Sequence, residues 1–268
     1  MHNPHDPQAQ WSCKSTTPDK QWVGYKVQVS ETVAETPCQR GEPTANVITA
    51  VVTQEAIASD KAALGPIEQE WEERGVEKPD ALYVDGGYTS GAELARAREE
   101  SRELLGPMAV PPTKDKRFNP EDFNVNVEQR RAECPGGKTN SQCSRLEEGK
   151  SGKVSYRFEF ARADCQQCPL KANCLGAGQQ HRTLTVSEHH TVIQERRVEQ
   201  KTDAFKVDMH RRNGIEGTIS ELKRGYGMRR TRYRGLTKTS LCNLMIGAAC
   251  NLRRWSRRIA WETQMATI

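Results

Sequence analysis

The stretch MHRRNGIEGTISELKRGYGMRRTRYRG, residues 209–235, contains the pattern that decides the fold. Its apolar residues recur at spacings of four and three, which is the periodicity of one helical face: Ile215, Ile219 and Leu222. Gly225 and Gly227 follow the last of them and predict the end of the helix. A cluster of arginines comes next: Arg229, Arg230, Arg232 and Arg234. The stretch therefore predicts an amphipathic helix that packs on a core and leads into a strongly basic segment.

A second stripe on this helix is polar and contains one acid among cations. Its members are three and four residues apart, so they line up along one face: Arg212, Glu216, Ser220 and Lys223. One carboxylate beside several cations suits a polyanion held against a metal ion. The alternative is a solvated salt-bridge face, which is the usual role of a glutamate with basic neighbours.

The spacing Arg-x3-Glu-x6-Lys, formed by Arg212, Glu216 and Lys223, resembles the Tyr-Arg-Glu-Lys signature of bacterial insertion-sequence transposases of the DDE type. The wider text GIEGTISELKRGYGMRRTRYRGLTKTSL is similar to the same block in a subgroup of these enzymes. Met209 stands at the position of the signature's tyrosine, so that side chain's DNA contact is not carried over. The resemblance implies that Glu216 is the last acid of the catalytic triad.

The stretch ALYVDGGY, residues 81–88, predicts a short buried strand that ends in Asp85. Gly86 and Gly87 then begin a turn into a helix over residues 91–102. A carboxylate at the C-terminal end of a buried strand points into the crevice where α/β sheets place their chemistry. Such aspartates are also common turn residues. The text resembles the block of the same transposases that carries the second catalytic aspartate, which implies that role for Asp85.

These two acids indicate metal-assisted cleavage of phosphodiester bonds. Two divalent ions about 3.5–4 Å apart neutralise charge at the attacking and leaving oxygens, and Mg²⁺ (or Mn²⁺) prefers carboxylate oxygens. We expect Asp85 and Glu216 to supply two of three ligands. The resemblance places the third on the first strand of a ribonuclease-H-like fold. The segment DPQAQW, residues 6–11, matches text that follows this strand, so we expect a truncated copy without a complete two-metal site. Asp6 is the alternative third ligand.

The strands and helices between these motifs predict an α/β fold. Residues 22–33 alternate apolar and polar side chains, which predicts a half-buried strand. Residues 46–53 are β-branched and almost continuously apolar, which predicts a central strand that forms a hairpin with the first. A helix is expected to follow, with Asp60 as its cap. Together with the resemblance, this pattern predicts a ribonuclease-H-like domain that lacks its first strand. Residues 1–109 are its N-terminal part, and residues 187–268 are its C-terminal helices.

Those C-terminal helices are predicted from charge and periodicity. Residues 187–206 form one charged helix, in which His189, His190, Arg196 and Arg197 are treated as surface residues. A four-three repeat predicts the face through which the final helix packs on the domain: Leu241, Met245, Ala248, Leu252 and Trp255. Four arginines are expected to end that helix, where they suit the helix dipole and phosphate: Arg253, Arg254, Arg257 and Arg258.

Residues 110–186 are predicted to form an inserted, cysteine-rich subdomain. Four cysteines, two of them in a CxxC pair, are the candidate ligands of a structural zinc ion: Cys134, Cys165, Cys168 and Cys174. The two-residue spacer lets both thiolates face one ion at ~2.3 Å. Cys143 or His181 are substitutes, and free cysteines in a loop are the alternative. Strands over residues 155–160 and 182–186 are expected to flank this site.

The charge distribution points to nucleic acid as the partner. The chain of 268 residues has a formal net charge of +5, but residues 206–258 contain fourteen Lys and Arg against three Asp and Glu. Positive charge gathered in one region is typical of a nucleic-acid binder, and the alternative is a solubilising basic tail. The sequence has no targeting segment and no apolar run long enough to cross a membrane, so we expect a cytoplasmic protein with free thiols or metal-bound cysteines.

The first functional hypothesis is a DDE-type transposase region that cleaves and joins DNA with Mg²⁺ or Mn²⁺, in a truncated and inactive copy. Its partners are transposon ends and target DNA, and it assembles as a homo-oligomer on DNA. The expected DNA-contacting residues are Arg212, Lys223, Arg229, Arg230, Arg232 and Arg234. The second hypothesis is a non-catalytic, zinc-containing DNA-binding protein that regulates a full-length transposase.

Overall fold

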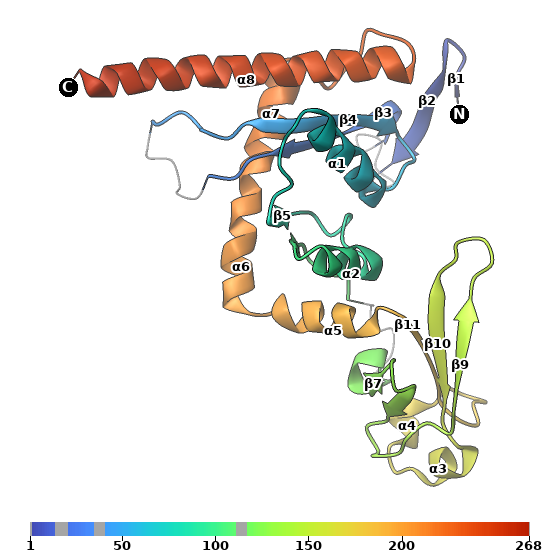
Figure 1. Ribbon diagram of the computed structural model, residues 1–268. Coiled ribbons are helices and arrows are strands. Elements are labelled where there is room, and N and C mark those ends of the chain that lie inside the picture. Colours follow the sequence, from blue (N-terminus) through green and yellow to red (C-terminus); the bar gives the residue numbers. More distant parts are fainter. Residues whose placement is uncertain (1, 14–20, 35–40, 111–116, 268) are drawn as a thin grey trace. The chain divides into compact units, whose positions relative to one another are not determined.

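A computed structural model describes residues 2–13, 21–34, 41–110 and 117–267 (Figure 1). The protein is a mixed α/β structure, as predicted, and it divides into two compact units. Unit 1 consists of Met1–Tyr88 together with Val207–Ile268, and unit 2 is Thr89–Lys206. Within the described residues, none of the helices has the length and apolar character that a membrane span requires.

Unit 1 is built on a four-stranded sheet in the order β1-β2-β3-β4. Its strands are β1 (His2–Asn3), β2 (Asp6–Cys13), β3 (Gln21–Glu31) and β4 (Ile48–Glu55). The antiparallel pairing of β3 with β4, in which Val29 lies opposite Val51, confirms the predicted hairpin. β4 is almost continuously buried because helices cover both of its faces.

One face of β3 and β4 is covered by α1 (Leu64–Glu73), which follows a short 3₁₀ helix, η2 (Asp60–Ala63). Together these elements confirm the predicted helix. Ile67 and Trp71 pack against Ala50 and Val52 of β4. The side chain of Trp71 is 2% exposed, and its indole N–H donates a hydrogen bond to Thr49 Oγ1 at 3.1 Å. The next strand, β5 (Ala81–Tyr83), comes after α1 in the chain.

The other face of the sheet is covered by α7 (Gly214–Gly225) and α8 (Leu236–Ala266). Their shared core contains Ile48, Val51, Leu222 and Cys250. Gly247 allows α8 to lie close to β4, because a Cβ atom at this position would come within 2.8 Å of Val51 Cγ2. The end of α7 at Gly225 and the burial of Leu222 agree with the sequence pattern.

The predicted packing face of α8 is wrong. The five residues of the four-three repeat are all exposed: Leu241, Met245, Ala248, Leu252 and Trp255. The buried face instead consists of Thr239, Asn243, Gly247, Cys250 and Arg254. These small and polar residues let α8 approach β4 and bond to it: the Asn243 amide donates to Thr53 Oγ1 at 3.0 Å. The helix also continues through the arginines to Ala266.

Unit 2 contains a three-stranded antiparallel sheet in the order β11-β10-β9. Phe123, Phe158, Phe160 and Leu184 form the centre of its core. The elements are α2 (Gly91–Glu99), β6 (Glu103–Leu105), η3 (Pro120–Asp122), β7 (Asn124–Asn126), β8 (Arg131–Glu133), β9 (Gln142–Glu147), β10 (Val154–Glu159), α3 (Arg162–Gln167), α4 (Lys171–Cys174), β11 (Thr183–Ser187) and α5 (His190–Glu199). Strands β10 and β11 correspond to the two predicted in the cysteine-rich segment.

The single helix predicted over residues 187–206 is two helices, α5 and α6 (Asp203–His210), and a 3₁₀ turn, η4 (Arg211–Asn213), leads from α6 into α7. The surface assignment in this region is also wrong for three residues. His190 is 6% exposed, and burial together with the charge of Arg197 lowers the pKa of its imidazole. The side chains of Arg196 and Arg197 are 11% and 12% exposed. Both arginines keep acidic partners, which is why they can be buried.

Candidate functional site

Asp85 lies in the turn that follows β5, two residues beyond the end of that strand. Its side chain is exposed, and Oδ1 accepts a hydrogen bond from the Gly86 N–H at 2.6 Å. The Tyr88 N–H donates to the Asp85 carbonyl at 2.9 Å, which closes the turn. The strand is shorter than predicted, so Asp85 lies in this turn rather than at the strand's end.

A polar network on the α1 face of the sheet lies next to this turn. The Tyr88 hydroxyl donates to the side-chain oxygen of Gln28, and the Gln28 amide donates to Asp60 Oδ1 at 3.0 Å. The Lys26 ammonium donates to the same oxygen at 3.1 Å. Burial raises the pKa of Tyr88, and the charges of Asp60 and Asp85 raise it further. The fold therefore brings the Asp60 carboxylate near Asp85.

The predicted role of Asp60 as a helix cap is wrong. The helix η2 begins without a side-chain capping hydrogen bond, because the Asp60 carboxylate bonds to β3 instead. Gly87 also lies against it: a Cβ atom there would be 2.9 Å from Asp60 Oδ2. The sequence signal for this network is the polar pair Lys26 and Gln28, which share one face of β3 because side chains alternate along a strand.

Glu216 lies in the first turn of α7 and points into solvent. Its side chain is 65% exposed, and Oε1 is 3.7 Å from Arg212 Nη1. The buried residues of α7, Thr218 and Leu222, face the side of the sheet opposite to Asp60. The described structure thus does not join Glu216 to the network beside Asp85. In the described parts of the chain, no group of three or more His, Cys, Asp or Glu side chains could hold a metal ion.

A buried ion-pair network fixes α7 and α8 to β3. Arg254 donates to Glu31 Oε2 at 3.2 Å, to Glu221 Oε2 at 3.0 Å and to Thr218 Oγ1 at 2.6 Å. The side chains of Arg254 and Glu31 are only 7% and 4% exposed. Although burial lowers it, the pKa of Arg254 is held above its ordinary value by the hydrogen bonds to Glu221 and Glu31. The expected phosphate contact by Arg254 is therefore wrong, because the side chain is enclosed within unit 1.

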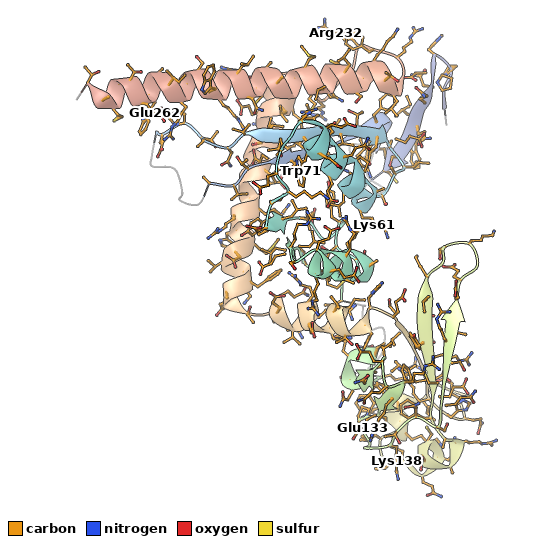
Figure 2. All side chains as sticks on the ribbon, viewed as in Figure 1. Lys61, Trp71, Glu133, Lys138, Arg232 and Glu262 are labelled. Carbon is orange, nitrogen blue, oxygen red and sulfur yellow. The ribbon has the colours of Figure 1, made fainter. Side chains whose placement is uncertain are left out.

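Five of the six cations predicted to contact DNA lie in residues 223–234, which comprise the end of α7 and the connection to α8 and which we call the basic segment. The sixth, Arg212, lies in η4. The exposed cations of the basic segment are Lys223, Arg224, Arg229, Arg230, Arg232 and Arg234. Arg232 projects outward from unit 1 (Figure 2). None of these six forms an ion pair with an acid in the described residues. The Met228 N–H donates to the Leu222 carbonyl at 3.1 Å, so the segment begins at a fixed point.

The far end of the basic segment is held by β2. The Gly235 N–H donates to Asp6 Oδ2 at 3.2 Å, and the Leu236 N–H donates to Gln8 Oε1 at 2.8 Å. The Tyr25 hydroxyl approaches both oxygens of Asp6, at 2.9 and 2.8 Å. Burial and the contacts with Asp6 raise the pKa of Tyr25 to about 12. Asp6 is 6% exposed and both of its oxygens are engaged, so it anchors α8 rather than serving as an open metal ligand.

The four cysteines proposed as zinc ligands are free thiols of intermediate burial in unit 2. Cys134 and Cys168 lie beside Gly136, where a Cβ atom would be 3.6 and 3.2 Å from their sulfurs. Burial raises the pKa of Cys174, and the charges of Cys165, Cys134 and Cys168 raise it further. The four thiols are thus near one another, although they are not arranged as a ligand set. Cys143 lies on β9 and packs against the same core.

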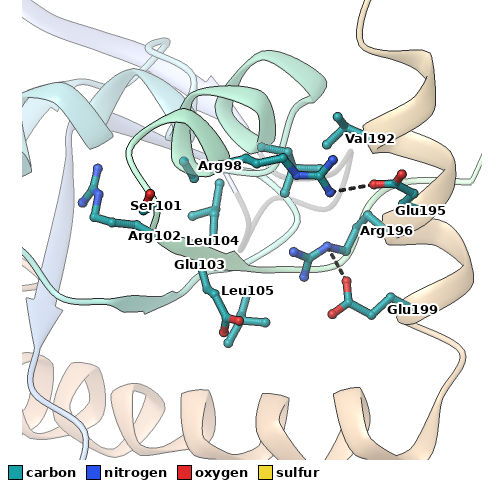
Figure 3. Close-up of a pocket in the computed structure, with 12 residues that line it drawn as sticks. Arg98, Ser101, Arg102, Glu103, Leu104, Leu105, Val192, Glu195, Arg196 and Glu199 are labelled. Carbon is teal, nitrogen blue, oxygen red and sulfur yellow. Dashed lines mark hydrogen bonds and ion pairs between the residues drawn. The ribbon is translucent and has the colours of Figure 1, made fainter.

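Unit 2 also contains a cavity of about 320 Å³ between α2, β6 and α5 (Figure 3). Its charged lining residues are Arg98, Arg102, Glu103, Glu195, Arg196 and Glu199. Arg98 pairs with Glu195 at 2.6 Å, and Arg196 pairs with Glu199 at 3.2 Å. Since acids and bases balance in this lining, the cavity is not an anion site of the kind that DNA phosphates require.

Comparison with protein families gives a match over residues 133–256 to the model of the transposase DDE domain. The matched segment contains the four cysteines, Glu216 and the basic segment, and it begins after Asp85. A search of curated proteins and a search of solved structures found no match.

Proposed function

We propose that this chain binds DNA and contributes Asp85 and Glu216 to metal-dependent cleavage and strand transfer. The match of residues 133–256 to the transposase DDE domain supports this proposal, since it confirms the resemblance to the C-terminal part of a DDE-type transposase. The observation that carries the proposal is the basic segment, which continues from the end of the helix that bears Glu216. Its cations are exposed, and backbone hydrogen bonds hold it on both sides of the arginines. Cations on a segment that is already fixed can bind a phosphate backbone with little loss of conformational entropy.

The carboxylates fit the divalent metal that DDE transposases use. Asp85 and Glu216 are exposed and offer hard oxygen ligands, which suit Mg²⁺ or Mn²⁺. A third acid is needed for a two-metal site. Residues 25–31 of β3 pair with β4 along one edge, and no other described strand pairs with them. We propose that a strand added at this open edge carries the third acid and completes a ribonuclease-H-like sheet.

In the proposed reaction, Asp85 and Glu216 would hold divalent ions, whose chemistry would be to neutralise charge at the oxygens of the phosphodiester. Water attacks the bond at the element's end and frees a 3′ hydroxyl, which then attacks the target DNA in line. Lys223 would hold a phosphate near the scissile bond because it lies on the same helix as Glu216. Arg212 would do so from the 3₁₀ turn η4, where its guanidinium lies 3.7 Å from the Glu216 carboxylate. The arginines of the basic segment track the backbone on either side. We propose that the active assembly on transposon ends and target DNA is a homo-oligomer.

DNA binding provides the direct test of this proposal. We expect the quadruple substitution of Arg229, Arg230, Arg232 and Arg234 by alanine to weaken affinity for double-stranded DNA by at least about 100-fold at low salt. The dependence of log Kd on log salt should fall by roughly 3 to 4, since each lost phosphate contact removes about 0.9 from the slope. Fluorescence anisotropy at several salt concentrations measures both quantities.

The matched control removes four exposed cations from the β9–β10 region of unit 2: Arg145, Lys150, Lys153 and Arg157. This variant has the same change in net charge but keeps the basic segment intact, so it should retain most of the affinity and of the salt slope. Equal losses in the two variants would show a general charge effect and would contradict the role of the basic segment.

A second candidate function is a non-catalytic, zinc-containing DNA-binding protein that regulates a full-length transposase. The gathering of four thiols in unit 2 favours it: Cys134 and Cys168 lie beside Gly136, and the charges of Cys134, Cys165 and Cys168 raise the pKa of Cys174. We propose that Cys134, Cys165, Cys168 and Cys174 close around Zn²⁺ after small side-chain rotations. Thiolate ligands suit zinc, and binding would lower the pKa of the Cys174 thiol, which burial raises.

The expected zinc content is about one ion per chain, measured by mass spectrometry of the purified protein under native conditions. Cys168→Ser should lose the metal, since it removes one of the four ligands. Cys13→Ser is the control, because Cys13 is an exposed thiol on β2 in unit 1. A metal-free wild-type protein that binds no added Zn²⁺ would rule out the site, and it would leave the DNA-binding proposal unaffected.

A further inference from the structure

We propose that the exposed apolar stripe of α8 is a docking surface for α8 of a second copy of this chain. Four large members of the stripe are highly exposed: Leu241 60%, Met245 62%, Leu252 64% and Trp255 65%. Ile259 extends it at 44% exposure. With Ala248 at its centre, we call this set the α8 seam. Large apolar side chains rarely form one continuous exposed row on a monomer, so the row marks an interaction site.

The seam has the periodicity of a helix-pairing surface. Its residues are spaced four, three, four, three and four apart from Leu241 to Ile259. This is the a/d repeat by which one helix packs its side chains between those of another. The residues that bind β4 lie on the opposite side of α8, so the seam is not needed for packing within unit 1. Figure 1 shows α8 as one uninterrupted helix with α7 and β4 on one side.

The residues beside the seam fit a second copy better than they fit DNA. The neighbouring positions Cys242, Ala249 and Ser256 are small and uncharged, so two helices can approach closely. No lysine or arginine lies within the seam, which excludes a phosphate backbone as its natural partner. The flanking cation Arg258 is already paired with Glu42 and Glu262, each at 2.6 Å, so two copies would not repel each other there.

A two-fold symmetric pair is the simplest assembly that buries this row. In such an interface the same patch lies on both chains, and an apolar stripe is complementary to itself. The helix of 31 residues is about 46 Å long at 1.5 Å per residue, so the seam is long enough for repeated contacts. Covering the five large side chains on both copies buries on the order of 1,000 Å², which is near the lower limit of a specific interface.

The test is the mass of the DNA-free protein, measured by sedimentation equilibrium over a range of concentrations. We expect the wild-type mass to rise from 30.2 kDa towards twice that value. Leu252→Glu places a charge in the middle of the seam, so it should raise the dissociation constant at least 10-fold. Because Leu252 is exposed, this variant should keep the wild-type circular dichroism and thermal midpoint, which separates a lost interface from a lost fold.

Ala260→Glu is the matched control, since Ala260 is exposed on the same helix but outside the seam, and the charge change is identical. It should dimerise as the wild type does. A wild-type protein that stays at 30.2 kDa, a Leu252→Glu variant that dimerises normally, or an assembly of more than two copies would each overturn the proposal. DNA is absent from this experiment, so its failure leaves the proposed function untouched.

Discussion

Replacing Arg254 by alanine is expected to destabilise unit 1 by about 3–5 kcal/mol, which is the typical cost of breaking a buried ion pair by removing one partner. The substitution would leave Glu31 without its cation at 4% exposure and would remove the two hydrogen bonds that Arg254 donates to Glu221. Thr218 would lose a partner as well. Equilibrium unfolding in urea, followed by circular dichroism, measures the change in the free energy of unfolding.

The control is Arg253→Ala, the neighbouring position on the same helix, where the arginine is exposed. We expect it to change the free energy of unfolding by less than about 0.5 kcal/mol, as for other surface substitutions. Adding Glu31→Gln to Arg254→Ala should recover part of the stability, because it removes the uncompensated charge. Similar stabilities of the Arg253 and Arg254 variants would contradict the structural role assigned to the network.

The second large effect is expected at the two proposed metal ligands. Asp85→Asn and Glu216→Gln preserve side-chain size but remove the negative charge. Each should lower Mn²⁺ affinity at least about 10- to 100-fold, since even indirect partners of metal ligands contribute that much. Electron paramagnetic resonance of Mn²⁺ measures the binding. In a protein to which the strand with the third acid has been added, metal-dependent nicking of transposon-end DNA should fall in parallel, whereas DNA affinity should stay within a factor of about two.

Asp208→Asn on α6 is the control, since it makes the same chemical change at an acid with a side chain 47% exposed. It should bind Mn²⁺ as the wild type does. If Asp85→Asn and Glu216→Gln also retain wild-type Mn²⁺ binding and DNA nicking, the two acids do not hold the metal. The chain would then be better described as the zinc-containing regulator.

The regular elements of unit 1 could be predicted because their periodicity has one interpretation. Alternation in residues 22–33 and the β-branched run in residues 46–53 specify two paired strands, and the structure confirms them as β3 and β4. The helix that carries Glu216 was predictable for the same reason: Leu222 is buried and Gly225 ends the helix. In α7 the agreement is partial: Ile215 and Ile219 of the predicted stripe are only half-buried, and the second buried residue is Thr218.

The packing of α8 could not be predicted, because this helix has two candidate faces. The face with the larger side chains, Leu252 and Trp255 among them, satisfies the usual pattern and is nevertheless exposed. The real contact uses Gly247 for close approach and Asn251 for hydrogen bonds to both backbone groups of Ile48, at 2.9 and 2.8 Å. Small and polar residues carry a weak sequence signal, since their effect depends on the geometry of the partner strand.

The candidate site was predictable only in part. The motifs give Asp85, Glu216 and the basic segment, and the structure shows where each one lies. The hydrogen bonds of Asp60 to β3 join it to Lys26, 34 positions away, and to Gln28, 32 positions away. No local sequence pattern predicts contacts between residues so far apart. Whether two acids share one metal depends on such distant contacts. The sharing of metal ions between Asp85 and Glu216 therefore remains a prediction.

Unit 1 is assembled from two segments that are far apart in the sequence, and this affects how it can fold during synthesis. The contacts of Asn251 with Ile48 join positions 203 residues apart, so they cannot form before α8 has left the ribosome. Until then the newly made β4 has an uncovered apolar face, and closing so long a loop is slow. A prematurely terminated product ending before α7 would expose that face permanently, and we expect it to aggregate or be degraded.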